Sequence, residues 1–301
     1  MKKLVIAAGT GFLGQALTAY FKDTVDEIII LTRGENRNNA NIKYVHWDAK
    51  TLNCWEAELE HADVLINLAG KSVDCRYTEQ NKNKIIASRV DSTVVLGKAI
   101  AQCDYLPLHW LNSSTATIYR HSEDKQMDEV TGEVGADFSM NVAKMWERAF
   151  FCCHIPTTRK TALRTSIVLG KGGGAFPALL KLAQLGLGGK QGNGRQFVSW
   201  IHETDFARAV GFLIQNKMDG VVNVVSPAPV RNSEFMTTLR KAAGIPFGIP
   251  QPKWLLQLGA AVIGTETELV LKSRNVVPSR LLEAGFKFEY AEVERTLADL
   301  V

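Results

Sequence analysis

The first half of the chain alternates short apolar runs with stretches in which apolar residues recur at helical spacing. The apolar runs predict buried strands at residues 4–8, 27–32, 42–47, 63–68, 108–112 and 161–169. The intervening stretches predict helices at residues 11–22, about 82–101 and 142–151. Strands and helices that alternate in this way favour right-handed crossovers, so the pattern predicts an α/β fold with a doubly wound parallel sheet covered on both faces.

The character of the sequence changes after about residue 170. Glycines cluster at residues 172–174 and between residues 186 and 194, and strand-like pieces recur at residues 197–201 and 221–225. The segment from Ser226 onward carries most of the prolines and several short helical patterns. We therefore expect a main domain over residues 1–225, with an inserted loop at about 171–196, and a smaller C-terminal lobe over residues 226–301.

Composition and charge argue against several classes of protein. The 301 residues carry a net charge of +4 with no long basic run, which disfavours a nucleic-acid partner. The five cysteines form no CxxC pair and the six histidines show no zinc-binding spacing, so we expect reduced thiols and no metal site. No apolar stretch approaches the roughly 18 residues of a membrane span, and the N-terminal apolar run is too short for a secretion signal. We expect a cytoplasmic monomer or homodimer.

The strongest local signal is a glycine-rich segment between the first strand and the first helix. Its pattern is GxGxxG, in which the glycines permit a tight turn, close approach of a pyrophosphate, and close packing of helix on strand. The amides at the start of the helix then face the phosphates. The segment predicts a Rossmann-type domain whose cofactor loop is formed by Gly9, Thr10, Gly11, Phe12, Leu13 and Gly14.

The end of the second predicted strand indicates which dinucleotide binds. An NAD site places an acid there to hold the ribose 2′-hydroxyl, but this strand ends in Thr32-Arg33. A guanidinium at that position can form charge-assisted hydrogen bonds to a 2′-phosphate, and Arg37 can share it. The sequence therefore favours NADP over NAD, the alternative being that Arg33 is an ordinary solvated loop residue.

Further motifs follow one another along nearly the whole chain. They are Asn67-Leu68-Ala69-Gly70, Ser88-Arg89, Trp146-Glu147, Leu163-Arg164, Val168-Leu169-Gly170, Ser199-Trp200-Ile201-His202, Asn223 to Pro229, Pro278 to Leu281, and Gly285-Phe286-Lys287-Phe288. In this order they resemble the extended short-chain dehydrogenase/reductase superfamily. More narrowly, the chain resembles its atypical epimerase family of the YfcH type, which has a C-terminal module of its own.

This resemblance implies a set of cofactor contacts beyond the glycine loop. The set is Thr32, Arg33, Leu68, Ala69, Gly70, Lys84, Arg89, Ser113 and Val168. In the family, the residues at the second strand contact the adenosine end, whereas Val168 would line the nicotinamide side. Packing in the core explains Leu68, Ala69 and Val168 equally well. The smaller C-terminal lobe would then help to bind a small-molecule substrate.

The same resemblance raises a question about catalysis. Enzymes of the superfamily use a serine or threonine together with a YxxxK pair, in which the lysine lowers the pKa of the tyrosine so that it can act as acid or base. Thr115 falls in the hydroxyl position and Lys144 in the lysine position, but Met140 replaces the tyrosine. Methionine cannot transfer a proton. Another acid must substitute, and the candidates are Tyr119, Glu147 and His202, each of which also has a structural explanation.

The substrate side also departs from the nucleotide-sugar epimerases. The loop at residues 192–196 resembles one that leads to an arginine holding the substrate diphosphate, but Val198 occupies that position and Arg195 is out of register. A nucleotide-sugar substrate is therefore disfavoured. We instead expect a more apolar pocket formed by Tyr119, Met140, Phe176 and Trp200.

Two functional hypotheses from different classes follow. The first is an NADP-dependent oxidoreductase or epimerase-like enzyme that acts on a small molecule. The second is a protein that binds NADP without catalysis and works as a sensor or interaction protein. The glycine loop with Arg33 supports both hypotheses, and Met140 favours the second.

Overall fold

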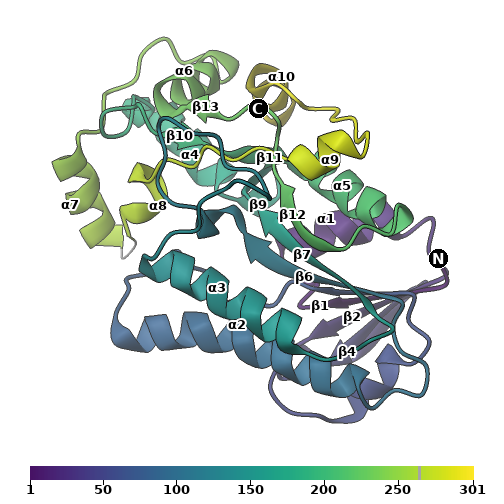
Figure 1. Cartoon of the computed structure of the whole chain (residues 1–301). Helices are drawn as coiled ribbons and strands as arrows, with labels where there is room; N and C mark the ends of the chain where they lie inside the picture. The colour runs from purple at the N-terminus through teal and green to yellow at the C-terminus, as the bar shows by residue number, and fades with distance from the viewer. Residues whose placement is uncertain (264–265) are drawn as a thin grey trace.

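The computed structural model of the chain describes residues 1–263 and 266–301. An eight-stranded sheet forms the centre of the molecule (Figure 1). Its strands are β1 (Lys3–Ala7), β2 (Glu27–Thr32), β3 (Arg37–Asn39), β4 (Ile42–His46), β5 (Val64–Asn67), β6 (His109–Thr115), β7 (Arg159–Thr165) and β12 (Gly220–Val224). In space they follow the order β12-β7-β6-β5-β1-β2-β4-β3, which confirms the predicted doubly wound α/β fold.

The strand order reverses at β1. The chain builds the sheet outward from β1 through β2 to β4, then returns to place β5 on the other side of β1. Neighbouring strands pair in parallel except at the edge, where β3 pairs antiparallel with β4. In such sheets a ligand binds at the carboxyl ends of the strands beside the reversal point. The loops that follow β1 and β5 therefore lie at the expected binding edge.

The antiparallel edge strand β3 was not predicted from the sequence. Its three residues, Arg37-Asn38-Asn39, are polar and exposed, so no apolar pattern marks them as a strand. The hairpin they form with β4 places Arg37 opposite Tyr44.

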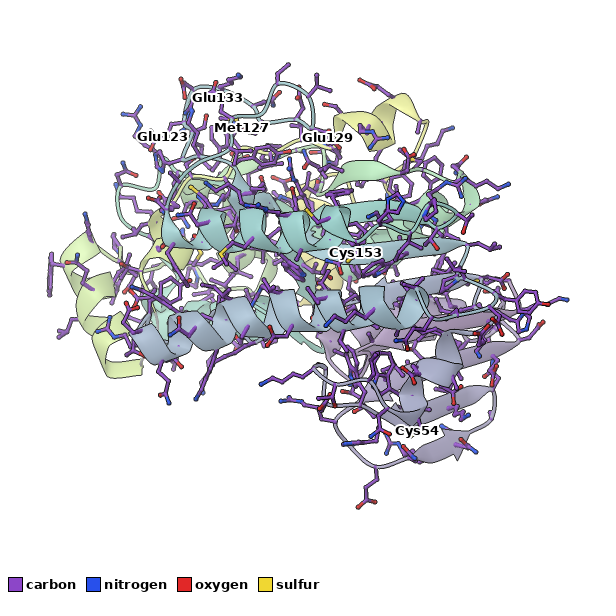
Figure 2. The ribbon with its side chains drawn as sticks, turned by 60° about the horizontal axis from the view of Figure 1, so that its bottom comes forward. Cys54, Glu123, Met127, Glu129, Glu133 and Cys153 are labelled. Atoms are coloured by element: carbon purple, nitrogen blue, oxygen red, sulfur yellow. The ribbon has the colours of Figure 1, made fainter. Side chains whose placement is uncertain are left out.

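Helices cover both faces of the sheet. α1 (Phe12–Phe21) and α5 (Glu203–Gln215) pack on one face, and α2 (Glu79–Ile100) and α3 (Phe138–Cys152) pack on the other (Figure 1). Figure 2 shows α2 and α3 side by side, with Cys153 at the end of α3. A side chain at Gly97 of α2 would place its Cβ 2.5 Å from the Cys153 Sγ, so the close packing of these helices requires a glycine there.

The long helix α2 begins earlier than the apolar pattern predicted, whereas α3 contains the predicted residues 142–151. The first turn of α2 is polar, and the Thr78 hydroxyl caps it by accepting the Asn81 amide at 3.2 Å. A polar, capped first turn carries no apolar periodicity, so the predicted start at about residue 82 was three residues late.

The run at residues 161–169, predicted as one strand, is two strands that belong to different sheets. β7 ends at Thr165, and β8 (Ile167–Gly170) lies between β11 (Trp200–His202) and β9 (Gly173–Gly174) in a second, three-stranded sheet. The run at residues 197–201 divides in the same way, because β10 (Phe197–Val198) pairs with β13 (Val230–Arg231). Polar residues stand at both breaks, Arg164 to Ser166 in the first run and Ser199 in the second, but polar residues inside a strand pattern do not by themselves show that a strand changes sheets.

Shorter helices complete the structure. They are α4 (Phe176–Leu182), α6 (Asn232–Ala242), α7 (Lys253–Ile263), α8 (Glu268–Leu271), α9 (Ser279–Glu283), α10 (Val293–Leu300), and the single-turn elements η1 (Cys54–Leu59), η2 (Ala116–Ile118) and η3 (Ala183–Leu187). α4, η3, α6 and α10 share one hydrophobic core with Trp200 and Leu169. Within the described ranges, no helix is long and apolar enough to cross a membrane.

We predict that His109, at the start of β6, makes the stability of the fold depend on pH. Its Nε2 donates to the Thr161 hydroxyl at 2.7 Å, because that hydroxyl itself donates to the Met218 carbonyl. Burial lowers the pKa of His109 from 6.5 to about 4. Between pH 6.5 and 4, His109 is protonated in the unfolded chain but neutral in the folded chain. The free energy of unfolding should therefore fall by about 3 kcal/mol as the pH is lowered through this range.

Urea unfolding of the protein and of His109→Gln across this pH range measures the effect. Glutamine keeps a donor toward Thr161 but does not titrate, so the variant should lose about 3 kcal/mol less than the parent between pH 6.5 and 4. Identical pH profiles for the two proteins would contradict the assignment.

Candidate functional site

The three glycines of the loop after β1 have different structural roles. A Cβ on Gly9 would lie 2.9 Å from side-chain carbons of Ile6 and Ile30, and a Cβ on Gly14 would collide with the Gly9 carbonyl. These two glycines let the loop pack on the sheet and on α1. A Cβ on Gly11, in contrast, would meet nothing within 4 Å. The space above Gly11 is open, as the approach of a pyrophosphate requires.

The start of α1 completes an anion-binding geometry. Gly11 is the N-cap residue, no side chain caps the first turn, and that turn contains no acid. The first amides of the helix are therefore free to donate to a phosphate. Two features hold the loop in place: the Gln15 Nε2 donates to the Thr10 carbonyl at 3.0 Å, and the Ala8 amide donates to the Leu31 carbonyl at 2.8 Å.

A cationic cavity lies beside this loop. It measures about 260 Å³ and is lined by Gly9, Thr10, Gln15, Thr18, Ala19, Lys22, Arg37 and Tyr44. The Arg37 guanidinium stacks over the Tyr44 ring, 4.1 Å from its centroid, which fixes the cation on the cavity wall. At the end of β2, Thr32 is buried and its hydroxyl accepts the Gly34 amide at 3.1 Å, whereas Arg33 is exposed.

The loop after β5, at the adjacent strand end, is shaped by a buried network of hydrogen bonds. The Asn67 side chain accepts the Ala69 amide at 3.0 Å and donates to the Asn112 side chain at 2.7 Å. The Thr93 hydroxyl of α2 joins both asparagines and accepts the Trp146 indole N–H at 3.1 Å. Sequence analysis singled out the loop but missed Thr93 and Asn112. The one available signal was an asparagine at or next to the end of each of the two predicted strands, 63–68 and 108–112.

Ser88 and Arg89 of α2 hold the far end of the same loop. The Ser88 hydroxyl accepts the Lys71 amide at 2.9 Å, and the Arg89 Nη1 donates to the Lys71 carbonyl at 3.0 Å. A Cβ on Gly70 would lie 3.3 Å from the Arg89 Cζ, so the guanidinium lies directly against the loop. Burial lowers the pKa of Arg89 to about 10. A buried guanidinium beside the loop is well placed to interact with a bound anion.

The remaining predicted cofactor residues occupy three further positions. Lys84 is exposed on α2, and Ser113 is half-buried near the end of β6. Val168 is 7% exposed and packs in the core of the sheet. Phe12 of the glycine loop packs against β9, where a Cβ on Gly173 would lie 2.9 Å from the Phe12 Cβ and Cγ. The Gly173–Gly174 hairpin is therefore shaped to receive this ring.

The predicted catalytic residues Thr115 and Lys144 lie on elements that pack together. β6 runs three residues beyond its predicted end, so Thr115 is its last residue, and the Thr115 hydroxyl caps η2 by accepting the Thr117 amide at 3.1 Å. α3 packs on η2 and carries Lys144, which is exposed, one turn after Met140. The Met140 thioether is buried against Gly135, where a side chain would collide with its sulfur.

Two candidates for the missing acid, Tyr119 and Glu147, belong to one buried network. Glu147 forms a two-pronged ion pair with Arg164, both distances 2.7 Å, and accepts the Ser114 hydroxyl at 2.6 Å. The Tyr119 hydroxyl accepts the Arg164 Nη1 and donates to the Asn223 side chain, both at 2.9 Å. Burial raises the pKa of Tyr119. The Glu147 carboxylate and the Tyr119 hydroxyl are thus both engaged in hydrogen bonds within the protein.

The network continues from Asn223 to the loop before α3. The Asn223 amide donates to the Glu129 carboxylate at 2.9 Å, and burial raises the pKa of Glu129. Figure 2 shows Glu129 with Met127 on this loop, on the side of α3 away from α2.

His202, the third candidate acid, caps a helix. Its Nδ1 accepts the Thr204 amide at 3.0 Å at the start of α5, and its ring stacks on Tyr290 at 3.8 Å. Burial lowers the pKa of His202 although Asp299 lies 3.3 Å from its Nε2. These contacts favour a neutral imidazole with a structural role.

One prediction about the substrate side is wrong. Phe176 and Trp200 are fully buried in the core formed with the C-terminal helices, whereas Tyr119 belongs to a separate core, so these residues do not form a shared apolar pocket. Arg195 is 73% exposed and lies 3.4 Å from Glu123, away from these groups. Among the described residues, no cluster of three acids, histidines or cysteines has the geometry to hold a metal ion.

The reversal point, the glycine loop and the uncapped start of α1 define a dinucleotide-binding protein of the Rossmann class. Residues 4–225 match the family model of the NAD dependent epimerase/dehydratase family, and residues 251–300 match DUF1731, a domain of unknown function. The chain therefore belongs to the NAD dependent epimerase/dehydratase family, which confirms the resemblance found in the sequence.

Relatives match over almost the whole chain. The chain is 33% identical to the epimerase family protein SDR39U1 of Mus musculus over 306 residues, covering 99% of each chain. It is 31% identical to the epimerase family protein YfhF of Bacillus subtilis, covering 99% of this chain and 97% of the relative. The crystal structure of human SDR39U1 (isoform 2) with NADPH superimposes with a TM-score of 0.87 at 30% identity, covering 99% of this chain and 98% of that one.

We predict that the buried Glu147–Arg164 pair is needed for stability. Their side chains are only 11% and 10% exposed, so removing one partner leaves the other charge buried without compensation. Arg164→Met should lower the free energy of unfolding by about 3–5 kcal/mol in urea titrations. The double variant Glu147→Met/Arg164→Met should be more stable than Arg164→Met, because neither charge remains. Arg148→Met, an exposed change on α3, serves as control, and a loss as small as that control would refute the prediction.

Proposed function

We propose that the chain is an NADP-dependent oxidoreductase or epimerase-like enzyme that acts on a small molecule. The open space above Gly11, next to the free amides of α1, is the observation that carries the proposal, because a dinucleotide pyrophosphate fits that geometry. The structure of a relative with NADPH supports the choice of cofactor.

The cationic cavity supports NADP rather than NAD. We assign the 2′-phosphate to the edge of this cavity, between Thr10, Arg33 and Arg37, where two guanidinium groups would pair with it. Leu68, Ala69 and Gly70 would lie along the cofactor, with the Arg89 guanidinium behind them. Lys84, Ser113 and Val168 complete the proposed set.

Bound NADP supplies hydride transfer at its nicotinamide ring. Of the chain's own residues, we assign the Thr115 hydroxyl to orienting a substrate carbonyl, and the exposed Lys144 ammonium to holding the cofactor ribose. Met140 supplies no proton, and Tyr119, Glu147 and His202 are engaged in structural contacts. A positioned proton donor contributes about 10²–10⁴-fold to rate, so we expect slow or narrow reductase activity.

An NADP-binding sensor without turnover is the second candidate, and Met140 in place of the tyrosine favours it. NADPH oxidation measured against a panel of carbonyl compounds, beside a direct measurement of NADPH affinity, separates the two functions. Turnover of any panel compound supports the enzyme, whereas tight binding with no turnover across the panel supports the sensor.

We further propose the domain division expected from the sequence, with residues 1–225 as the cofactor-binding domain and 226–301 as the lobe for substrate. The inserted segment at 171–196 supports this lobe, because Phe176 and Ala183 pack in one core with Phe235 and Leu297. The lobe is thus built from two parts of the chain.

We predict that the protein binds NADPH more tightly than NADH because of Arg33. A lost charge-assisted contact corresponds to about 1.5–3 kcal/mol, so Arg33→Ala should weaken NADPH binding about tenfold or more and leave NADH binding nearly unchanged. Titration of intrinsic fluorescence with each cofactor measures both affinities. Equal NADH and NADPH affinities in the unmodified protein would refute the assignment of Arg33.

We predict that Gly11→Val, which fills the open space, abolishes binding of both cofactors in a folded protein.

We predict that Met140→Tyr raises turnover of a small carbonyl substrate. The new phenol stands four residues before Lys144, whose charge should lower its pKa well below the model value of about 10. Ultraviolet titration of the introduced phenol measures this shift, which should disappear in Met140→Tyr/Lys144→Ala. If Met140→Tyr leaves turnover unchanged while Tyr119→Phe abolishes it, the acid is Tyr119 and the assignment by position fails.

A further inference from the structure

Arg274 is a second half-buried guanidinium, outside the proposed cofactor set. Its backbone is fixed on both sides, because its amide donates to the Phe197 carbonyl at 2.9 Å and its carbonyl accepts the Ser199 hydroxyl at 2.7 Å. The preceding Ser273 is fully buried and donates to the Ser122 carbonyl. The side chain therefore projects from a rigid segment of the C-terminal lobe.

The Arg274 guanidinium has little compensation for its charge. Among the described residues, the guanidinium makes a single hydrogen bond, from Nη1 to the Ser273 carbonyl at 3.5 Å. Burial lowers the pKa of Arg274, although Glu268 and Asp137 lie near enough to oppose the shift. Lys272 already pairs with both of these acids. Within residues 1–263 and 266–301, no carboxylate reaches ion-pair distance of Arg274.

Tyr77 presents a buried hydroxyl to the same region. Its ring packs edge-on against Phe138 with centroids 4.9 Å apart, and its amide donates to the Glu266 carboxylate at 2.9 Å. The hydroxyl oxygen is buried and has no hydrogen-bond partner in the part of the chain that the structure describes. Burial raises the pKa of Tyr77 to about 12, so the hydroxyl remains a donor. A buried donor without an acceptor is costly unless a ligand supplies one.

Contacts around the first turn of α3 bring these groups together. Asp137 pairs with Lys272, Phe138 packs on Tyr77, and Ser139 donates to Glu268. The next residue along the helix is Met140, one turn before Lys144. Arg274 lies two residues after Lys272, on the segment that the Lys272–Asp137 ion pair ties to α3.

We propose that Arg274 and Tyr77 form a binding site for an oxyanion of the substrate, a carboxylate or a phosphate, beside the first turn of α3, the helix that carries Met140 and Lys144. The guanidinium supplies a charged, forked donor and the phenol supplies a third hydrogen bond. The inference rests on the proposed function, since it assigns the substrate class of that same site: small carbonyl compounds or alcohols that carry an anionic group.

Binding of defined probes to the NADPH-loaded protein tests this proposal. The probes are benzoylformate for a carboxylate, phenyl phosphate for a phosphate, and methyl benzoylformate as the neutral counterpart, each measured by isothermal titration calorimetry. At least one anion should bind at least tenfold more tightly than the neutral ester, and the better anion identifies the group. If neither anion binds more tightly than the ester, the proposal is overturned.

Variants assign the site to residues. Arg274→Met should weaken binding of the favoured anion tenfold or more, and Arg274→Lys should weaken it less, because the charge stays while the fork is lost. Tyr77→Phe should weaken it about threefold to tenfold. Arg148→Met, an exposed arginine on α3, is the matched control and should leave binding unchanged.

NADPH affinity, measured in the same variants, separates this proposal from the proposed function. Arg274→Met and Tyr77→Phe should leave it unchanged, and a tenfold loss of NADPH affinity in Arg274→Met would overturn the proposal by assigning Arg274 to the cofactor. Where a probe is turned over, Tyr77→Phe should raise KM rather than lower kcat, and the reverse would make Tyr77 a proton donor instead. If the parent binds no NADPH, the proposed function fails, and the same probes without NADPH still decide the assignment of Arg274.

Discussion

The buried ion pair between Glu147 and Arg164 determines where α3 lies on the sheet, and the rest of the site depends on that position. Arg164 projects from β7 and Glu147 from α3, and the pair is completed by Ser114 of β6 and by the Tyr119 hydroxyl. A displaced helix would leave two charges buried without partners, which costs several kcal/mol. The pair therefore holds Met140 and Lys144 in a fixed position relative to the carboxyl end of β6.

Most polar groups at this edge of the sheet form structural hydrogen bonds that fix the loops, and they are not free to take part in catalysis. Asn67 and Asn112 form the loop after β5, and His202 caps α5. Such buried hydrogen bonds are costly to break, because each leaves an unsatisfied partner. Two cations near this edge are held more loosely in the part of the chain that the structure describes: Arg33 at the end of β2 is exposed, and the Arg274 guanidinium makes one long hydrogen bond, to the Ser273 carbonyl. A site with this balance is better suited to hold anions than to move protons.

The sequence predicted the features that follow from periodicity and from the glycine pattern. Buried strands of a parallel sheet are continuous apolar runs, so β1, β2 and β5 were found, and the glycine loop indicated the cofactor before any geometry was known. Contacts between residues that are distant in the sequence could not be predicted. Nothing in the sequence pairs Arg164 with Tyr119, so Tyr119 appeared free to act as an acid. The division between β7 and β8 was missed because apolar residues resume at Ile167, so the polar residues Arg164 to Ser166 did not mark the end of a strand.

In the proposed function, Met140 at the tyrosine position of the superfamily separates binding from turnover. Met140 is packed against Gly135, away from the glycine loop and from the Arg37 cavity, so its change removes a proton donor without disturbing the groups assigned to NADP. Arg274 and Tyr77 are likewise independent of it, since rigid backbone contacts hold the one and Phe138 packs on the other. With both proposed sets of donors, the chain would bind cofactor and an anionic ligand together whether or not it catalyses, because affinity depends on these donors and rate depends on a proton donor.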